Sequence, residues 1–271
     1  MPDLLELSRL WLRQYHPAPG AGLTLVAFPH AGGSASYFQP LSAALSPDVE
    51  VLSLQYPGRQ DRRSEPCLDS IGGLVEGICE VLSPRTERPV VFFGHSMGAV
   101  LAYETARRLE KESSVRLLGL VASGRRSPTT AREETVHLRD DAGILAEIQR
   151  LNGTDSALLQ DEDIQRMILP SLRADYTAVE TYAHQAGPAL RCPVTVFTGD
   201  ADPQVTRAEA ERWSELTDGG FRLRSFPGGH FYLATRPGAV TGALTEEIAA
   251  FRTPGSRAAA AGPGDVGPGA G

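Results

Sequence analysis

The sequence GHSMG at residues 94–98 is the first pattern in this chain that could carry out chemistry. It has the form G-x-S-x-G, directly follows the apolar run Val90–Phe93, and precedes an amphipathic stretch. In a sharp turn from strand to helix, flanking glycines let the backbone pack tightly while the serine hydroxyl is exposed at the tip of a sheet. The helix then offers free backbone N–H groups, including that of Met97, to an anion. The motif therefore predicts Ser96 as a nucleophile.

A serine hydroxyl needs a base that accepts its proton, and His230 is our candidate. It lies in a Pro-Gly-Gly-His-Phe-Tyr segment just past the last predicted strand, where a loop can bring its imidazole over the serine. The other five histidines adjoin the nucleophile, precede it, or lie in a predicted insertion: His95, His16, His30, His137 and His184.

A carboxylate that orients the base is expected in the segment Thr198–Pro203, TGDADP, which follows another apolar run. Asp200 comes directly after the glycine and could tie the turn through its own backbone. Asp202 lies farther out, where reaching the histidine is easier. We predict Asp202 as the acid, with Asp200 as the alternative. The chain order of serine, acid and histidine is that of α/β-hydrolases.

Small residues follow the first clear strand in the segment FPHAGGSAS, residues 28–36. An α/β-hydrolase places its second oxyanion donor at this position. We predict the backbone N–H groups of Ala31 and Met97 as the two donors. Neither of the common phosphate-binding glycine patterns is present in the sequence.

The elements that must position these residues alternate along the chain. Short apolar runs predict strands, and amphipathic stretches between them predict helices. Strands that are apolar on both faces and separated by helices indicate an α/β fold with a mostly parallel sheet covered on both sides. The predicted strands are 23–28, 49–54, 90–93, 117–122, 192–197 and 221–226, and the predicted helices are 71–82, 99–109, 207–216 and 239–251.

One hydrolase domain is expected over residues 1–252. Residues from about 127 to 185 show helical spacing and no convincing strand, which predicts a helical lid inserted over one end of the sheet. Residues 253–271 are rich in glycine, proline and alanine, and we expect a disordered tail.

Composition narrows the class of protein. The 271 residues are 41% hydrophobic, enough for a sizeable core, and the formal charge of −7 disfavours nucleic-acid binding. The three scattered cysteines suggest neither disulfides nor a metal site. No apolar run is long enough to span a membrane, and the basic region of a signal peptide is missing. We expect a cytoplasmic monomer that uses no cofactor and no metal.

Several motifs together resemble the type II thioesterases, the stand-alone editing hydrolases of polyketide and nonribosomal peptide synthesis. The motifs are PHAGGSA near residue 30, QYPGRQDRR at 55–63, GHSMG at 94, LPSLRADYTAVETY at 169–182, GDADP at 199 and GGHFYL at 228. In that family the aspartate two residues beyond the GD turn orients the histidine, and this residue corresponds to Asp202. The LRADY segment there belongs to the lid, and GRQDRR to a loop near the entrance.

The resemblance implies hydrolysis of thioesters between acyl groups and the phosphopantetheine arm of an acyl or peptidyl carrier protein. Such enzymes clear stalled carriers of short acyl units. Ser96 would form an acyl-enzyme, and water activated by His230 would then hydrolyse it.

Two further groups of residues are candidates for substrate binding. Arginines at positions 59, 62, 63, 125 and 126 could form a basic rim that docks an acidic carrier, although solvated charges explain them as well. Helical spacing of Tyr176, Val179 and Tyr182 fits an acyl channel or the packing of the lid. The predicted binding residues are Arg59, Arg62, Arg63, Tyr176 and Tyr182.

Three other functions remain open. A carboxylesterase or lipase would use the same triad on oxygen esters. A terminal thioesterase is disfavoured because no carrier domain precedes this one. A hydrolase fold without activity could act as a carrier-binding module, which the complete set of Ser, His and Asp candidates disfavours.

Overall fold

The structure, a computed structural model, describes residues 3–85, 87–151 and 158–253. Its centre is a seven-stranded sheet in the order β1-β3-β2-β4-β5-β6-β7. Strand β1 is antiparallel to β3, and all other neighbours are parallel. The bounds are β1 Leu12–Arg13, β2 Thr24–Phe28, β3 Glu50–Leu54, β4 Val90–His95, β5 Leu117–Ser123, β6 Val194–Gly199 and β7 Phe221–Phe226. The predicted mostly parallel α/β sheet is therefore confirmed.

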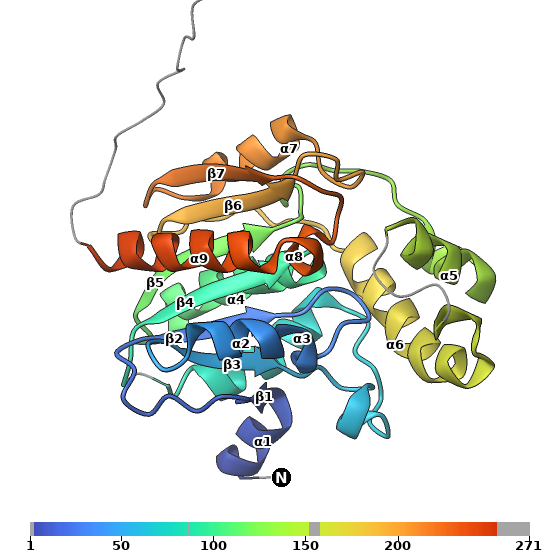
Figure 1. Ribbon diagram of the computed structural model, residues 1–271, viewed down its shortest axis with the longest axis horizontal. Coiled ribbons are helices and arrows are strands. Elements are labelled where there is room, and N and C mark those ends of the chain that lie inside the picture. The colour runs from blue at the N-terminus through green and yellow to red at the C-terminus, as the bar shows by residue number, and fades with distance from the viewer. Residues whose placement is uncertain (1–2, 86, 152–157, 254–271) are drawn as a thin grey trace, which may run out of the picture.

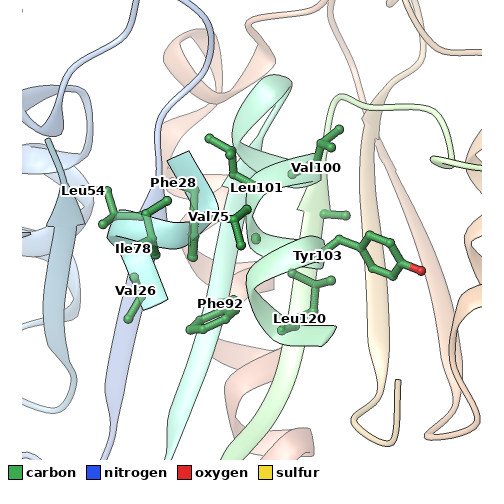
Figure 2. Close-up of a cluster of buried hydrophobic side chains, with 14 of the residues drawn as sticks. Val26, Phe28, Leu54, Val75, Ile78, Phe92, Val100, Leu101, Tyr103 and Leu120 are labelled. Carbon is green, nitrogen blue, oxygen red and sulfur yellow. The ribbon is translucent and has the colours of Figure 1, made fainter. Parts of the chain in front are cut away.

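Helices cover both faces of the sheet, because its central strands are apolar on both sides. Alternate residues of β2 show this: Val26 and Phe28 belong to one hydrophobic cluster, and Leu25 and Ala27 to another. The first cluster lies under α3 (Ile71–Leu82) and α4 (Met97–Glu112), as Figure 2 shows for part of it. The second lies under α2 (Gln39–Leu45) and α9 (Pro237–Arg252), which cross the opposite face in Figure 1.

The six predicted strands and four predicted helices all exist, with shifts at their ends. The predicted helix at 207–216 divides into α7 (Arg207–Glu211) and the 3-10 turn η5 (Arg212–Leu216). The short elements α1 (Leu4–Trp11), β1, α2 and α8 (Tyr232–Thr235) were not predicted. Elements of this length carry too few periodic residues to stand out in a sequence. The remaining short turns of the main body are η1 (Ala35–Phe38) and η2 (Gln60–Arg62).

The segment between β5 and β6 is helical in its described part. It contains η3 (Val136–Leu138), α5 (Asp141–Arg150), η4 (Leu158–Gln160) and α6 (Glu162–Glu180), which lie beside one end of the sheet in Figure 1. These elements share a small apolar cluster of their own, which includes Ile144, Ile148 and Leu172. A role as a lid remains a prediction. Of the predicted tail, residues 254–271 lie outside the described residues.

None of the helices among the described residues is long and apolar enough to cross a membrane.

Candidate active site

Ser96 occupies the sharp turn between β4 and α4. Its backbone has φ 54° and ψ −117°, a conformation that a residue with a side chain adopts only when its surroundings impose it. A Cβ at Gly94 would lie 2.1 Å from the carbonyl oxygen of Gly98, and a Cβ at Gly98 would lie 2.0 Å from that of Phe28. Both glycines of the motif are thus required for close backbone contact, as the sequence predicted.

His230 and Asp202 form a buried hydrogen-bonded pair. The Nδ1 atom of His230 lies 2.9 Å from Oδ2 and 3.1 Å from Oδ1 of Asp202, and both side chains are almost fully buried. Asp202 also accepts a 2.8 Å hydrogen bond from the backbone N–H of Gln204. A carboxylate beside Nδ1 favours the tautomer in which Nδ1 carries the proton and Nε2 is free to act as a base.

Asp200, the alternative acid, is exposed, and the carboxylate hydrogen-bonded to His230 is that of Asp202. Its Oδ1 atom accepts a 2.9 Å hydrogen bond from the backbone N–H of Gly228. Asp200 therefore connects the loop after β6 to the loop that carries the histidine.

The two predicted oxyanion donors lie in the segments expected. Met97 is the first residue of α4, and Ala31 follows β2 and lines the same cavity as Ser96. Within the part of the chain that the structure describes, neither backbone N–H has a protein acceptor. Both groups are thus available to an oxygen that develops negative charge at the serine.

Ser96 and His230 line one cavity of about 360 Å³. Tyr176 and Val179 contribute to its wall from α6, and many of the other lining residues carry charge. The charged lining residues are Arg125, Arg132, Arg139, Arg150, Glu133, Glu134, Glu147 and Glu180. Burial and the neighbouring Arg126 lower the pKa of Arg125 to about 10. The cavity is therefore not the apolar tunnel that a long fatty chain would need.

The predicted basic rim for carrier docking is wrong for most of its members. Arg59, Arg62 and Arg126 are only 4–6% exposed because each guanidinium is held inside the protein by acceptors. Arg62 pairs with Glu65 at 2.6 Å, and Arg126 pairs with Glu134. Since a docking residue must be accessible to a partner, these three arginines cannot serve in that way. Arg63 is exposed and remains a candidate.

The two predicted channel tyrosines have different environments. Tyr176 lines the cavity with Ser96, as predicted. Tyr182 packs against the core cluster under α4, and its hydroxyl donates to Glu104. The prediction that Tyr182 binds the acyl group is therefore wrong. The helical spacing placed Tyr182 on the same helix face as Tyr176, but α6 ends at Glu180, before Tyr182.

A second buried histidine lies beside the candidate base and was not predicted to matter. The ring of His95 is 5.1 Å from that of His230, and its Nδ1 atom lies 2.9 Å from the Ser123 hydroxyl, which contacts Tyr232 at 2.6 Å. Burial holds the pKa of His95 well below its usual value. Gly124, with φ 59°, lies beside both rings, and a Cβ there would lie 2.6 Å from His95 and 3.4 Å from His230. The available signal was this glycine, two residues after the predicted strand 117–122.

Stability is expected to fall as the pH drops below about 6.5, in part because of His30. Burial lowers the pKa of His30 from 6.5 to about 3, and nearby His230 and Arg59 act in the same direction. Between these values the unfolded chain binds a proton that the native protein does not. In this pH range the free energy of unfolding therefore falls by up to about 1.4 kcal/mol for each unit by which the pH drops, for a histidine of this kind.

Urea unfolding between about pH 5 and 7 measures this effect. The His30→Phe variant keeps an aromatic ring against Tyr37 and Phe231 but cannot be protonated. Its free energy of unfolding should depend less steeply on pH than that of the wild type. Identical slopes in the two proteins would contradict the assignment.

Comparison with known proteins adds to this geometry. The profile of the thioesterase domain matches residues 23–249, most of the chain. The chain belongs to the thioesterase family. The thioesterase is 55% identical over 243 residues to the protein named "Probable cadicidin biosynthesis thioesterase" of Streptomyces griseus. The aligned residues make up 90% of this chain and 67% of that protein. The thioesterase is also 52% identical over 227 residues to thioesterase PikA5 of Streptomyces venezuelae, covering 83% and 81% respectively.

Comparison with solved structures leads to the same family. The thioesterase superposes on the type II thioesterase BorB of the borrelidin biosynthetic cluster with a TM-score of 0.83 and 46% identity, covering 92% of this chain and 99% of that one. The resemblance to type II thioesterases and the α/β-hydrolase fold are thereby confirmed. The thioesterase is a serine hydrolase that acts on thioesters.

Proposed function

We propose that the thioesterase hydrolyses stalled or aberrant acyl groups from the phosphopantetheine arm of carrier proteins in polyketide or nonribosomal peptide synthesis. The observation that supports it most is the buried His230–Asp202 pair at the cavity that also contains Ser96. Two similar proteins support a role in such biosynthesis. One is the gramicidin S biosynthesis protein GrsT of Aneurinibacillus migulanus, at 36% identity over 224 residues, and the other is YbtT, a type II thioesterase from the yersiniabactin NRPS/PKS pathway, with a TM-score of 0.81 and 28% identity.

In the first step the Nε2 atom of His230 accepts the Ser96 proton as the serine oxygen attacks the thioester carbonyl. Asp202 holds the imidazole in the required tautomer and stabilises the positive charge that develops on it. The N–H groups of Ala31 and Met97 donate to the carbonyl oxygen as it becomes negative. Collapse of the tetrahedral intermediate breaks the carbon–sulfur bond, and the carrier thiol leaves with the proton from His230.

In the second step water replaces the thiol. His230 accepts a proton from the water, whose oxygen attacks the acyl-enzyme carbonyl. The same two N–H groups stabilise the second intermediate. Its collapse breaks the bond between the acyl carbon and the Ser96 oxygen, which takes the proton back from His230, and the free acid is released. No group beyond this chain and water is needed for either step.

The acyl cavity fits short and polar groups best. Its wall carries arginine and glutamate side chains, of which Glu134 is shared by Arg125 and Arg126, and Glu147 by Arg139 and Arg150. Packing methylenes against such a wall gains little, because hydrophobic stabilisation arises from apolar contact. Acetyl to butyryl groups should therefore be released faster than a palmitoyl group.

Mass spectrometry of a set of acylated carrier proteins after incubation with the enzyme tests the proposal. We expect free carrier thiol to appear, with kcat/KM falling as the acyl chain lengthens. Acyl-pantetheine thioesters and their oxygen-ester analogues serve as the comparison. Preference for the oxygen esters would favour a carboxylesterase, and carrier binding without any hydrolysis would favour a binding module.

A further inference from the structure

A carboxylate of α6 binds the loop that carries Ala31. The backbone N–H of Gly32 donates a 2.7 Å hydrogen bond to Oδ2 of Asp175, which lies in α6 and is fully buried. Gly32 has φ 72°, and Leu172, also from α6, packs where its Cβ would be. Helix α6 thus contacts the residue immediately after the candidate oxyanion donor.

Arg59 completes this contact. Its Nη1 and Nη2 atoms donate to Oδ2 and Oδ1 of Asp175 at 2.6 and 2.8 Å, and the two side chains are 5% and 0% exposed. Nη1 also lies 3.2 Å from the carbonyl oxygen of Gly33. Asp175 therefore accepts from the N–H of Gly32, and Arg59 donates to the carbonyl oxygen of the next residue, Gly33. A buried pair with this bidentate geometry is rigid.

The segment before Arg59 holds the same loop at its two ends. The Tyr56 hydroxyl donates to the carbonyl oxygen of Pro29 at 3.2 Å, and Oε1 of Gln55 accepts from the N–H of Ala35 at 2.9 Å. The N–H of Ala31 lies between these anchored groups, and in the described ranges it has no protein acceptor of its own.

We propose that Asp175 and Arg59 are positioning residues of the oxyanion hole: they fix the Gly32–Gly33 backbone and thereby aim the Ala31 N–H at the reacting carbonyl. This inference rests on the proposed function. It assigns the QYPGR motif, which contains Arg59, and the LRADY motif, which contains Asp175, to positioning of the oxyanion hole rather than to carrier docking. Because Asp175 belongs to α6, the donor is correctly aimed only while α6 is docked on the loop.

A matched pair of double variants isolates the Gly32 contact. Arg59→Met/Asp175→Asn and Arg59→Met/Asp175→Leu both lack the buried charges, so neither leaves an unpaired ion. Asparagine and leucine have similar shape, but only asparagine keeps an oxygen that can accept the Gly32 N–H. We expect kcat of the leucine variant to be about 10²-fold below that of the asparagine variant, with KM little changed.

A second readout separates positioning from a general effect on folding. An alkyl boronate mimics the tetrahedral intermediate, and a non-hydrolysable thioether analogue mimics the bound substrate. The boronate Ki should rise in the leucine variant by about the same factor as kcat falls, while the thioether Ki stays constant. Equal kcat and equal boronate Ki in the two double variants would overturn the inference.

Controls distinguish the possible failures. A wild-type enzyme that does not release acyl groups would reject the proposed function instead. Glu247→Gln weakens the ion pair that this fully buried carboxylate of α9 makes with the partly exposed Arg224, and should lower stability without changing kcat. If neither double variant folds, Arg59→Lys serves, because a lysine cannot make the bidentate contact. Its kcat should fall by at least about tenfold, and an unchanged kcat would reject the positioning role.

Discussion

Replacing Ser96 by alanine is expected to lower kcat by about 10⁶-fold, the largest effect of any single change in this thioesterase. The hydroxyl is the proposed nucleophile, and nothing else in the motif can form the acyl-enzyme. Steady-state hydrolysis of an acyl-pantetheine thioester measures the loss. Labelling with a fluorophosphonate, followed by mass spectrometry, should modify the wild type at Ser96 and leave the variant unlabelled.

Stability provides the control for this variant. The free energy of unfolding of Ser96→Ala should stay close to that of the wild type, since the strained backbone is retained. Ser96→Gly should be more stable than Ser96→Ala by about 1 kcal/mol, because glycine adopts φ 54° with little strain. Residual activity of Ser96→Ala above about 1% of wild type would reject Ser96 as the nucleophile.

Replacing Asp202 by asparagine is expected to lower kcat by about 10⁴-fold near neutral pH. The backbone N–H of Gln204 donates to Oδ1 of Asp202, so the amide oxygen of asparagine should keep that place. Its NH₂ group would then face Nδ1 of His230 and donate to it. The imidazole would be fixed in the other tautomer, with a proton on Nε2, and could not accept the serine proton.

Asp200→Asn is the matched control for this change. Its amide oxygen can still accept from the N–H of Gly228, which is the contact that Asp200 makes. We expect kcat within about tenfold of wild type, because the residue acts only on the loop. A large loss in Asp200→Asn together with a small loss in Asp202→Asn would reverse the assignment.

The sequence predicted the framework of the site well because each part depends on local patterns. Apolar runs between amphipathic stretches give a parallel sheet, and in such a sheet the loops at the carboxyl ends of the strands lie together. Ser96, Asp202 and His230 each lie three to five residues after the end of a predicted strand, so their meeting follows from topology alone. The short elements α1 and β1 were missed because their position depends on the packing of Trp11 of α1 against α3 and on the pairing of β1 with β3, which are both distant in sequence.

The arginines show where prediction from neighbouring residues in the sequence failed. Arg59 and Arg63 are four residues apart in one charged run, yet the first is buried and the second exposed. The difference is made by Asp175, which is 116 residues away in sequence and supplies the carboxylate that makes burial of Arg59 tolerable.

The chain itself determined the order of strands and helices, the strained serine turn with its two glycines, and the loops that carry acid and base, because those properties depend on neighbouring residues. Only the tertiary structure decided between Asp202 and Asp200 as the partner of His230, and only it joined Arg59 and Asp175 to the loop of Ala31. Such contacts depend on the relative placement of distant segments, which hydrophobic packing fixes without regard to sequence separation.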